Sequence, residues 1–194
     1  MHLKIAQVGE PVLREVAGTL TKEDILSDKI QNLIFEMRET MHAAPGVGLA
    51  APQIGLPLQL AVIEDKEEYF KDIAAEDLRE RERQPIPFQV IINPRITVTS
   101  EAVVEFFEGC LSLSGFSAVV PRARSVRVEC LDENGKPKVI DAGGWYARIL
   151  QHEIDHLNGH LYLDRMRSRT FTSLDNFNRF WKGKAITEIR SILG

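Results

Sequence analysis

The sequence predicts a fold of the α+β class, and three observations support this. Apolar residues recur at helical spacing over residues 30–41. Short apolar or alternating runs, typical of strands, occupy much of residues 58–131. The segment Asp132-Glu-Asn-Gly135 is typical of a hairpin turn, which joins antiparallel strands. With 194 residues, the chain is long enough to bury a core, and we expect residues 1–194 to form a single domain.

The composition is that of an ordinary soluble protein and argues against several classes. Hydrophobic residues make up 44% of the chain and charged residues 27%, and the net charge of −4 does not favour DNA as a partner. Two widely spaced cysteines, Cys110 and Cys130, do not form a disulfide framework, which favours a reducing compartment. No secretory signal and no apolar run near the ~20 residues of a membrane span is visible. We therefore expect a cytoplasmic protein without a membrane partner.

The N-terminal part predicts one core helix followed by a glycine-rich stretch. Residues 21–24 and Ser27-Asp28 resemble helix starts, and the apolar spacing after them gives a helix with one buried face. Residues 46–55 contain three glycines and other small residues, which let the backbone approach another group closely. We interpret this stretch as a turn between a helix and a strand. Gln53 is its polar side chain, and its amide can donate to a substrate oxygen.

Strands dominate the middle of the chain. We expect a buried strand at 58–63, then a charged, solvated insertion at 64–83 that contains a short helical stretch. Further strands are predicted at 88–92, 96–99, 102–107 and 125–131, with Asn93-Pro94 turning between the first two of these four.

A His-Glu-x-x-His pattern lies in the most apolar helix, which starts after Gly143-Gly144 and ends near Asn158-Gly159. His152 and His156 are four residues apart, so they project from one helix face and can hold one metal ion. Glu153 lies beside that metal, where a carboxylate can deprotonate metal-bound water. Because the helix is apolar around its circumference, we expect it in the core.

The C-terminal part predicts one more helix. Residues 161–163 read as a short strand or an extended segment, and residues 173–193 as an amphipathic helix with a possible break at Lys182-Gly183. Its cations Lys182, Lys184 and Arg190 are compatible with a transient ribosome contact, although a solvated helix face is the favoured explanation.

A catalytic metal with two histidine ligands needs a third protein ligand and one open position. The metzincin spacing places that ligand at Tyr162, and His160 lies two positions too early for it. Asp175 approximates the glutamate of a thermolysin-like site, but its side chain is one carbon shorter. Cys110 fits better, because its small and apolar neighbours make a thiolate costly without a metal. A structural, four-coordinate metal in a binding module is the alternative, but only three convincing ligands are present.

Three motifs together resemble the peptide deformylases. They are Gly-x-Gly-Leu-Ala-Ala-x-Gln at 46–53, Glu-Gly-Cys-Leu-Ser at 108–112 and Gln-His-Glu-x-Asp-His-Leu-x-Gly at 151–159. The resemblance implies antiparallel β-sheets packed around a central metal-binding helix, with an N-terminal and a C-terminal helix. It also implies removal of the formyl group from N-formylmethionyl nascent chains, with iron(II) as the metal and zinc, nickel or cobalt as substitutes.

Carried over by position, the resemblance assigns roles to individual residues. The metal ligands are Cys110, His152 and His156, and Glu153 is the catalytic carboxylate. The side-chain amide of Gln53 and the backbone N–H of Leu111 contact the formyl oxygen, and the further substrate-binding candidates are Val47, Gly48, Gly109, Arg148 and Ile149.

Two details of this assignment carry alternatives. Val47 and the Arg148–Ile149 turn are expected to line a methionine pocket, but Arg148 equally fits a surface position. Glu108 and Asp155 are expected to pair with Arg122 and to orient the ligands, but Asp155 equally fits a simple surface charge.

The resemblance is nearest to the branch that includes organellar deformylases. The chain starts without a transit peptide, so we expect a bacterial protein or a mature organellar form. The alternative activity is that of a zincin-type metallopeptidase.

Overall fold

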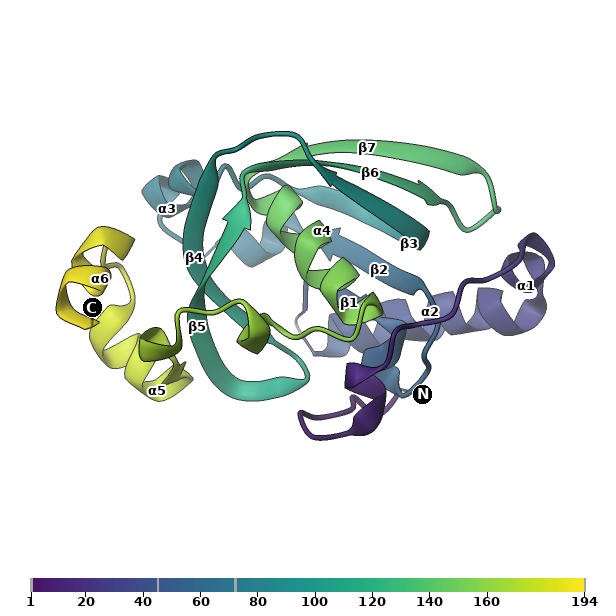
Figure 1. Ribbon diagram of the computed structural model, residues 1–194, viewed down its shortest axis with the longest axis horizontal. Coiled ribbons are helices and arrows are strands. Elements are labelled where there is room, and N and C mark those ends of the chain that lie inside the picture. Colours follow the sequence, from purple (N-terminus) through teal and green to yellow (C-terminus); the bar gives the residue numbers. More distant parts are fainter. Residues whose placement is uncertain (1, 45, 72, 194) are drawn as a thin grey trace.

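The computed structural model describes residues 2–44, 46–71 and 73–193 of the chain. Two antiparallel sheets surround one central helix, α4 (Gly144–Leu157) (Figure 1). The larger sheet has the order β1 (Gly48–Ala50), β2 (Leu60–Asp65), β3 (Ile86–Val98), β6 (Ser125–Leu131) and β7 (Pro137–Gly143). The smaller sheet consists of β4 (Val103–Cys110), β5 (Leu113–Ala123) and β8 (Thr172–Ser173). The predicted α+β class, with antiparallel sheets around a central helix, is confirmed.

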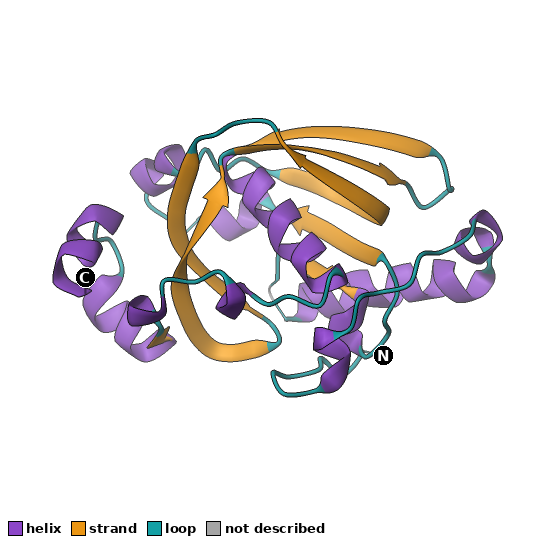
Figure 2. Ribbon diagram, in the orientation of Figure 1, coloured by secondary structure: helices purple, strands orange, loops and turns teal. Residues whose placement is uncertain are grey.

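Two N-terminal helices precede the sheets, α1 (Lys22–Leu26) and α2 (Asp28–Ala43) (Figure 2). Thr21 and Asp24 form a capping box at α1, and the side chain of Ser27 caps α2, as the sequence predicts. These caps satisfy backbone N–H groups that have no partner within a helix.

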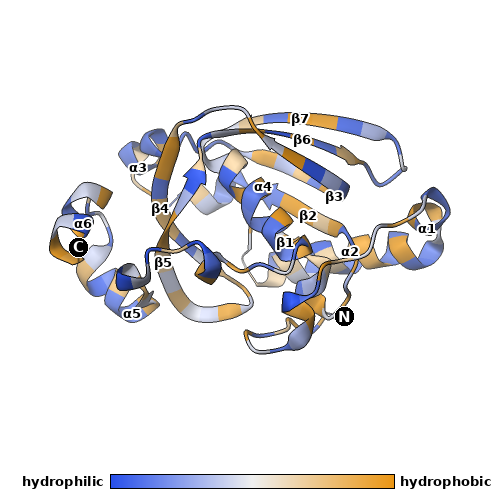
Figure 3. Ribbon diagram, viewed as in Figure 1, coloured by the Kyte–Doolittle hydropathy of each residue, from blue (hydrophilic) through white to orange (hydrophobic). Residues whose placement is uncertain are grey.

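The larger sheet separates two hydrophobic clusters. Leu60 and Val62 of β2 pack with the buried face of α2, whereas Ile63 belongs to the cluster around α4. Successive residues of a strand point to opposite faces, so β2 contributes to both clusters. Along β6 and β7, hydrophobic and polar residues alternate, because only one face of this hairpin is covered (Figure 3). The central helix is therefore held between the two sheets.

The predicted turn at Asn93-Pro94 is wrong. β3 continues through both residues, with a shift in its pairing to β6 between Ile92 and Arg95. Asn93 has a φ of +50°, and its side chain accepts from the N–H of Leu20 and donates to its carbonyl. A β-bulge uses the same residue types as a turn, so local sequence does not distinguish them. β5 is not predicted from the sequence, because Gly115 and Pro121 interrupt its pattern of apolar residues.

The charged segment 64–83 is more structured than predicted. It contains a 3₁₀ turn, η3 (Glu67–Phe70), and the helix α3 (Ala75–Glu80). Asp65 at its start is fully buried and accepts two hydrogen bonds from Arg83, at 2.7 and 2.8 Å. The ends of the segment are therefore joined in the interior, although its middle is polar.

The C-terminal segment breaks near the predicted position. It forms α5 (Leu174–Asn176), a π-helical turn η6 (Phe177–Trp181) and α6 (Ile186–Leu193), with Gly183 at a φ of +79° between the last two. Residues 162–164 form a 3₁₀ turn, η4, rather than a strand. α6 packs through Ile189 on Phe107 and Val119 of the smaller sheet. No helix in the described ranges is long and apolar enough to cross a bilayer.

Candidate metal centre

Cys110, His152 and His156 come together although they lie on different elements. Cys110 ends β4, and the two histidines project from one face of α4. Their candidate ligand atoms all lie within 4.8 Å of one another, and Cys110 Sγ lies 3.3 Å from His156 Nε2. The two imidazole rings are 5.0 Å apart between centroids. The rival ligands His160 and Asp175 are not part of this cluster.

The donor set suits a divalent cation. One thiolate and two imidazoles are ligands that zinc and iron accept, and three ligands leave a coordination position open. Although burial opposes a positive charge on His152, the Cys110 thiolate and the Glu108 carboxylate raise its pKa well above the usual value. Burial and the charge of His152 lower the pKa of His156, which keeps its ring neutral. The donor set of one sulfur and two imidazoles therefore fits a divalent cation.

Glu108 holds His152 in place. Its Oε2 lies 2.9 Å from His152 Nδ1, so the Nε2 atom of the ring is turned toward the cluster. Arg122 donates to both carboxylate oxygens at 3.0 Å, and Arg148 donates to Oε1 at 2.6 Å. Burial opposes the charge of Glu108, but the hydrogen bond from His152 and the charge of Arg122 hold its pKa well below the usual value. The carboxylate is therefore ionised and fixed.

The predicted pairing of Arg122 is confirmed. Besides Glu108, its guanidinium donates to Asp155, which also accepts from Arg165 at 2.6 and 2.7 Å. Asp155 is buried, so the alternative of a simple surface charge at this position is wrong. The chain of contacts from Asp155 through Arg122 to Glu108 braces the helix that carries both histidines.

Glu153 lies in the interior directly against β1. A Cβ atom on Gly48 would be 2.2 Å from Glu153 Oε1, so only glycine at position 48 leaves room for this carboxylate. Burial raises the pKa of Glu153 to about 7. Its Oε2 atom is buried and has no hydrogen-bond partner among the described residues. An acceptor in this state is suited to receive a proton near neutral pH.

Gln53 points its amide group at the cluster. Its Oε1 accepts from the N–H of Ala50 at 2.9 Å, which orients the Nε2 atom toward Cys110 Sγ at 3.4 Å and Ser112 Oγ at 3.2 Å. Leu111 follows Cys110 in the turn between β4 and β5, and its side chain lies close to Gly46. Sequence reasoning assigned no role to Ser112, although this residue ends the Glu-Gly-Cys-Leu-Ser motif.

Arg148 is buried and does not line a methionine pocket. It is 2% exposed, so the predicted surface alternative is wrong. Its guanidinium donates to Glu108 and to the carbonyls of Val120 and Val104, which directs it toward the smaller sheet rather than toward a methionine pocket. Val47 and Ile149 belong to the core cluster around α4. Tyr162, which sequence reasoning considered only as a missing ligand, stacks beside His152 with 6.4 Å between ring centroids.

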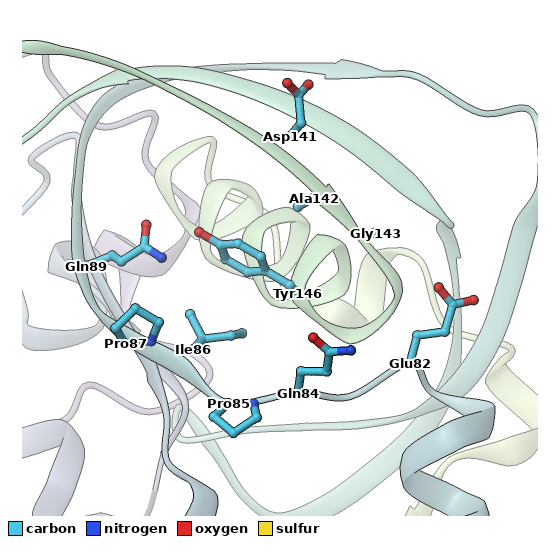
Figure 4. Close-up of a pocket in the computed structure, with 10 residues that line it drawn as sticks. All are labelled: Glu82, Gln84, Pro85, Ile86, Pro87, Gln89, Asp141, Ala142, Gly143 and Tyr146. Carbon is cyan, nitrogen blue, oxygen red and sulfur yellow. The ribbon is translucent and has the colours of Figure 1, made fainter.

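Two cavities lie near α4, but neither contains the metal ligands. One, of about 240 Å³, lies at the start of α4 between β3 and β7, where Tyr146 points toward Gln89 (Figure 4). The other, of about 390 Å³, lies between the β3–β4 connection and the C-terminal half of α4, with Arg122 and Asp155 in its lining. The metal centre is therefore defined by its side chains and not by either of these cavities.

Sequence comparison identifies related proteins. A family model described as polypeptide deformylase matches residues 2–172. Peptide deformylase 1A, chloroplastic, of Solanum lycopersicum is 48% identical over 90% of this chain, and peptide deformylase, mitochondrial, of Homo sapiens is 41% identical over 88%. The matched region spans 63% of the tomato protein, 65% of its Arabidopsis thaliana counterpart and 70% of the human protein. The chain thus spans less than two thirds of the length of the two plant relatives.

Comparison with solved structures also finds peptide deformylases. A peptide deformylase from Acinetobacter baumannii, bound to Met-Ala-Ser, superposes with a TM-score of 0.76 at 30% identity, covering 86% of this chain and 99% of the other. The peptide deformylase of Synechococcus elongatus in complex with actinonin gives 0.70 at 37% identity, covering 95% and 88%. Sequence and fold therefore agree that this chain belongs to the polypeptide deformylase family.

Proposed function

We propose that this protein hydrolyses the N-formyl group of N-formylmethionyl nascent peptides and releases formate. The observation that carries the proposal is the cluster of Cys110, His152 and His156 with the buried carboxylate of Glu153 on the same helix. Membership of the deformylase family supports it, as does the Acinetobacter baumannii relative bound to a peptide that begins with methionine. A zincin-type peptidase is not favoured, because the cluster contains a thiolate and not a third histidine or a glutamate.

Cys110, His152 and His156 would hold one divalent cation, for which we propose iron(II), with zinc, nickel or cobalt as substitutes. Such a cation supplies Lewis acidity, which lowers the pKa of water toward ~7 and polarises a carbonyl oxygen.

Glu153 is the proposed general base and acid. With a pKa of about 7, its carboxylate accepts a proton from the attacking water and returns it to the leaving amine. The contact with Gly48 fixes the position of the carboxylate, and its unpartnered Oε2 atom is free to take the proton. General acid–base catalysis of this kind typically contributes about 10²- to 10⁴-fold in rate.

Gln53 and Leu111 are the proposed donors to the formyl oxygen. The contact of Ala50 with Gln53 Oε1 supports this role, because it turns the amide N–H₂ group toward the centre. The backbone N–H of Leu111 directly follows Cys110 in the chain. Such fixed donors stabilise negative charge that develops on an oxygen, and losing one typically costs on the order of 10² to 10³ in rate.

The substrate backbone is proposed to bind beside Val47, Gly48 and Gly109. β1 is the terminal strand of its sheet, so among the described residues one of its edges is not paired with another strand. An extended peptide binds such an edge through main-chain hydrogen bonds. Val47 and Ile149 are proposed to contact the methionine side chain. Arg148 is better assigned to orienting Glu108, given its buried ion pair.

Formate release and metal content test the proposal together. The protein, purified without oxygen, is expected to release formate from formyl-Met-Ala-Ser, to leave acetyl-Met-Ala-Ser intact and to spare internal amides. Glu153→Gln should keep the metal and lose activity by at least about 100-fold. Glu129→Gln, the same change at an exposed position on β6, is the control. Full activity of Glu153→Gln, or a preference for internal amides, would overturn the proposal.

The ribosome contact and the cytoplasmic location remain predictions. Two of the three cations proposed for the ribosome already have carboxylate partners: Lys184 pairs with Glu188, and Arg190 pairs with Glu105 at 3.1 Å. The relatives include chloroplastic, mitochondrial and bacterial proteins, so the family is compatible with several compartments.

A further inference from the structure

Three consecutive residues near the N-terminus donate hydrogen bonds to the two segments that carry the proposed donors to the formyl oxygen. The N–H of Ala6 donates to the carbonyl of Gln53 at 2.7 Å. The side-chain amide of Gln7 donates to the carbonyl of Leu111 at 3.0 Å. The N–H of Val8 donates to the carbonyl of Ser112 at 2.8 Å. These three residues form an N-terminal strap that contacts both segments.

The strap joins two segments that are distant in the sequence. Gln53 lies in the 3₁₀ turn η2 (Ala51–Ile54), directly after β1. Leu111 and Ser112 lie in the turn between β4 and β5. The two segments also meet directly, because Gln53 Nε2 donates to Ser112 Oγ at 3.2 Å. Together with the strap, this hydrogen bond closes a ring, and the ring restrains the separation of the two proposed donors.

The core of the protein holds the start of the strap. Ala6 is buried in a hydrophobic cluster with Leu13 and Leu161. Three residues earlier, the N–H of Leu3 donates to Thr40 Oγ1 of α2 at 2.9 Å. These contacts are made outside the metal centre, so the strap has an anchor of its own to which the two segments are tied.

A tight turn holds the end of the strap. The N–H of Glu10 donates to the carbonyl of Gln7 at 3.0 Å, and Gly9 has a φ of +104°. Val8 does not have a positive φ, so this turn is of type II, with Val8 at its second position. Glu10 Oε1 also accepts from the N–H of Gln7 at 3.0 Å. The direction of the Val8 N–H is thus set by the turn itself.

The position of the donors matters for the proposed chemistry. A donor stabilises an oxyanion when it lies about 3 Å from the oxygen in the transition state, and a displacement of ~1 Å can cost up to about 100-fold in rate. The carbonyl of Leu111 also accepts from Ser114 Oγ at 3.2 Å, but Ser114 belongs to the same hairpin. Gln7 is the contact that ties this peptide group to the N-terminal part of the chain.

We propose that the N-terminal strap positions Gln53 and the N–H of Leu111 as donors to the formyl oxygen. This role rests on the proposed deformylation, in which both groups are donors. The strap acts through these groups and through Ser112, so its members are positioning residues. Negative charge on the oxygen develops only in the transition state, so loss of the strap should lower kcat and leave KM nearly unchanged.

Val8→Pro removes one hydrogen bond of the strap and keeps the turn. Proline is favoured at the second position of a type II turn, and Val8 is 44% exposed, so the variant should fold. We expect kcat for formyl-Met-Ala-Ser to decrease about tenfold and KM to change by less than about twofold. Val8→Ala keeps the N–H and should have the kcat of the wild type. Bound metal should be equal in both variants.

Gln7→Glu tests the contact with Leu111. The two side chains have the same shape, but a carboxylate does not donate a hydrogen bond to a carbonyl. We expect kcat to decrease about fivefold, again with little change in KM. Gln84→Glu, the same change at an exposed position, is the control. If Val8→Pro and Gln7→Glu both retain the kcat of the wild type, the proposed positioning role is overturned.

Hydrogen exchange and ligand binding separate the strap from the proposed activity. In the metal-loaded protein, mass spectrometry reports the exchange of backbone N–H groups within residues 108–114, with no turnover required. Acetohydroxamate is the binding probe, because its oxygens bind a divalent cation and accept hydrogen bonds.

The comparison is again between Val8→Pro and Val8→Ala. Faster exchange together with weaker acetohydroxamate binding in Val8→Pro supports the strap even if the wild type releases no formate, in which case only the proposed function fails. Faster exchange with unchanged binding and unchanged kcat would mean that the strap only stabilises the fold, and would overturn the proposal.

Discussion

The Cα atom of Gly48 lies directly against the carboxylate of Glu153, so strand β1 fixes the carboxylate of helix α4. A Cβ atom at position 48 would also be 2.5 Å from Glu153 Cδ, far closer than unbonded atoms approach. We therefore expect Gly48→Ala to displace Glu153 and to lower formate release by at least about tenfold, while the metal stays bound. Activity and metal content of the purified variant check this. Gly18→Ala, where the nearest atom is 3.7 Å away, should have wild-type activity.

The two cysteines should differ sharply in their effect on the metal. Cys110→Ala removes one of three ligands, so we expect weak metal retention and loss of activity. Cys130→Ala removes a buried thiol in β6 that is not part of the cluster and should retain the metal, with a modest loss of stability. Metal analysis after dialysis against a chelator distinguishes the two variants. Equal retention would mean that Cys110 is not a ligand.

Arg122 and Arg165 both pair with Asp155 but differ in burial. The side chain of Arg122 is 2% exposed and that of Arg165 is 47% exposed. Arg122→Met leaves buried carboxylates with less compensation, so we expect a loss of about 3–5 kcal/mol in the free energy of unfolding. Arg165→Met should cost about 1 kcal/mol or less. Urea unfolding of the metal-loaded variants measures both, and similar losses would contradict the assigned role of burial.

The phenol of Tyr146 should make the free energy of unfolding depend on pH in the alkaline range. Burial raises its pKa to about 12, from a value of 10.0 in the unfolded chain. Folding thus favours the protonated phenol, and this contribution is complete below pH 10 and lost as the pH rises from about 10 to 12. The stability of the wild type relative to Tyr146→Phe should be constant from pH 8 to 9 and then decrease by pH 11. Urea unfolding across this range measures the difference, and a constant difference at all pH values would contradict the buried phenol.

The metal centre could be predicted in large part because its geometry is local. Four-residue spacing on a helix places His152 and His156 together, and Glu153 follows from the same motif. Cys110 was identified from its small, apolar neighbours and from the family resemblance, because its distance from α4 in the sequence carries no geometric information. Arg148 was misplaced because a charged residue in a helix usually faces solvent, and its partners lie on β4 and β5. Only the tertiary fold brings those partners to it.

In the fold, too, features set by neighbouring residues were predicted, and features set by contacts between distant residues were not. Helix starts at Thr21 and Ser27 were predicted correctly, because a capping side chain acts within its own turn. The bulge at Asn93 was read as a turn, since both use a left-handed residue, and only pairing with β6 distinguishes them. Strand β5 was not predicted because Gly115 and Pro121 interrupt its pattern of apolar residues. Its pairing with β4 outweighs those local signals.

The order of the ligands along the chain bears on how the centre is assembled. The thiol of Cys110 and strands β4 and β5 precede, along the chain, the helix that carries both imidazoles. During translation this sulfur therefore has no histidine neighbours and no metal to shield it. A cysteine without a metal can be oxidised, so the sulfur of Cys110 is open to oxidants until helix α4 emerges from the ribosome.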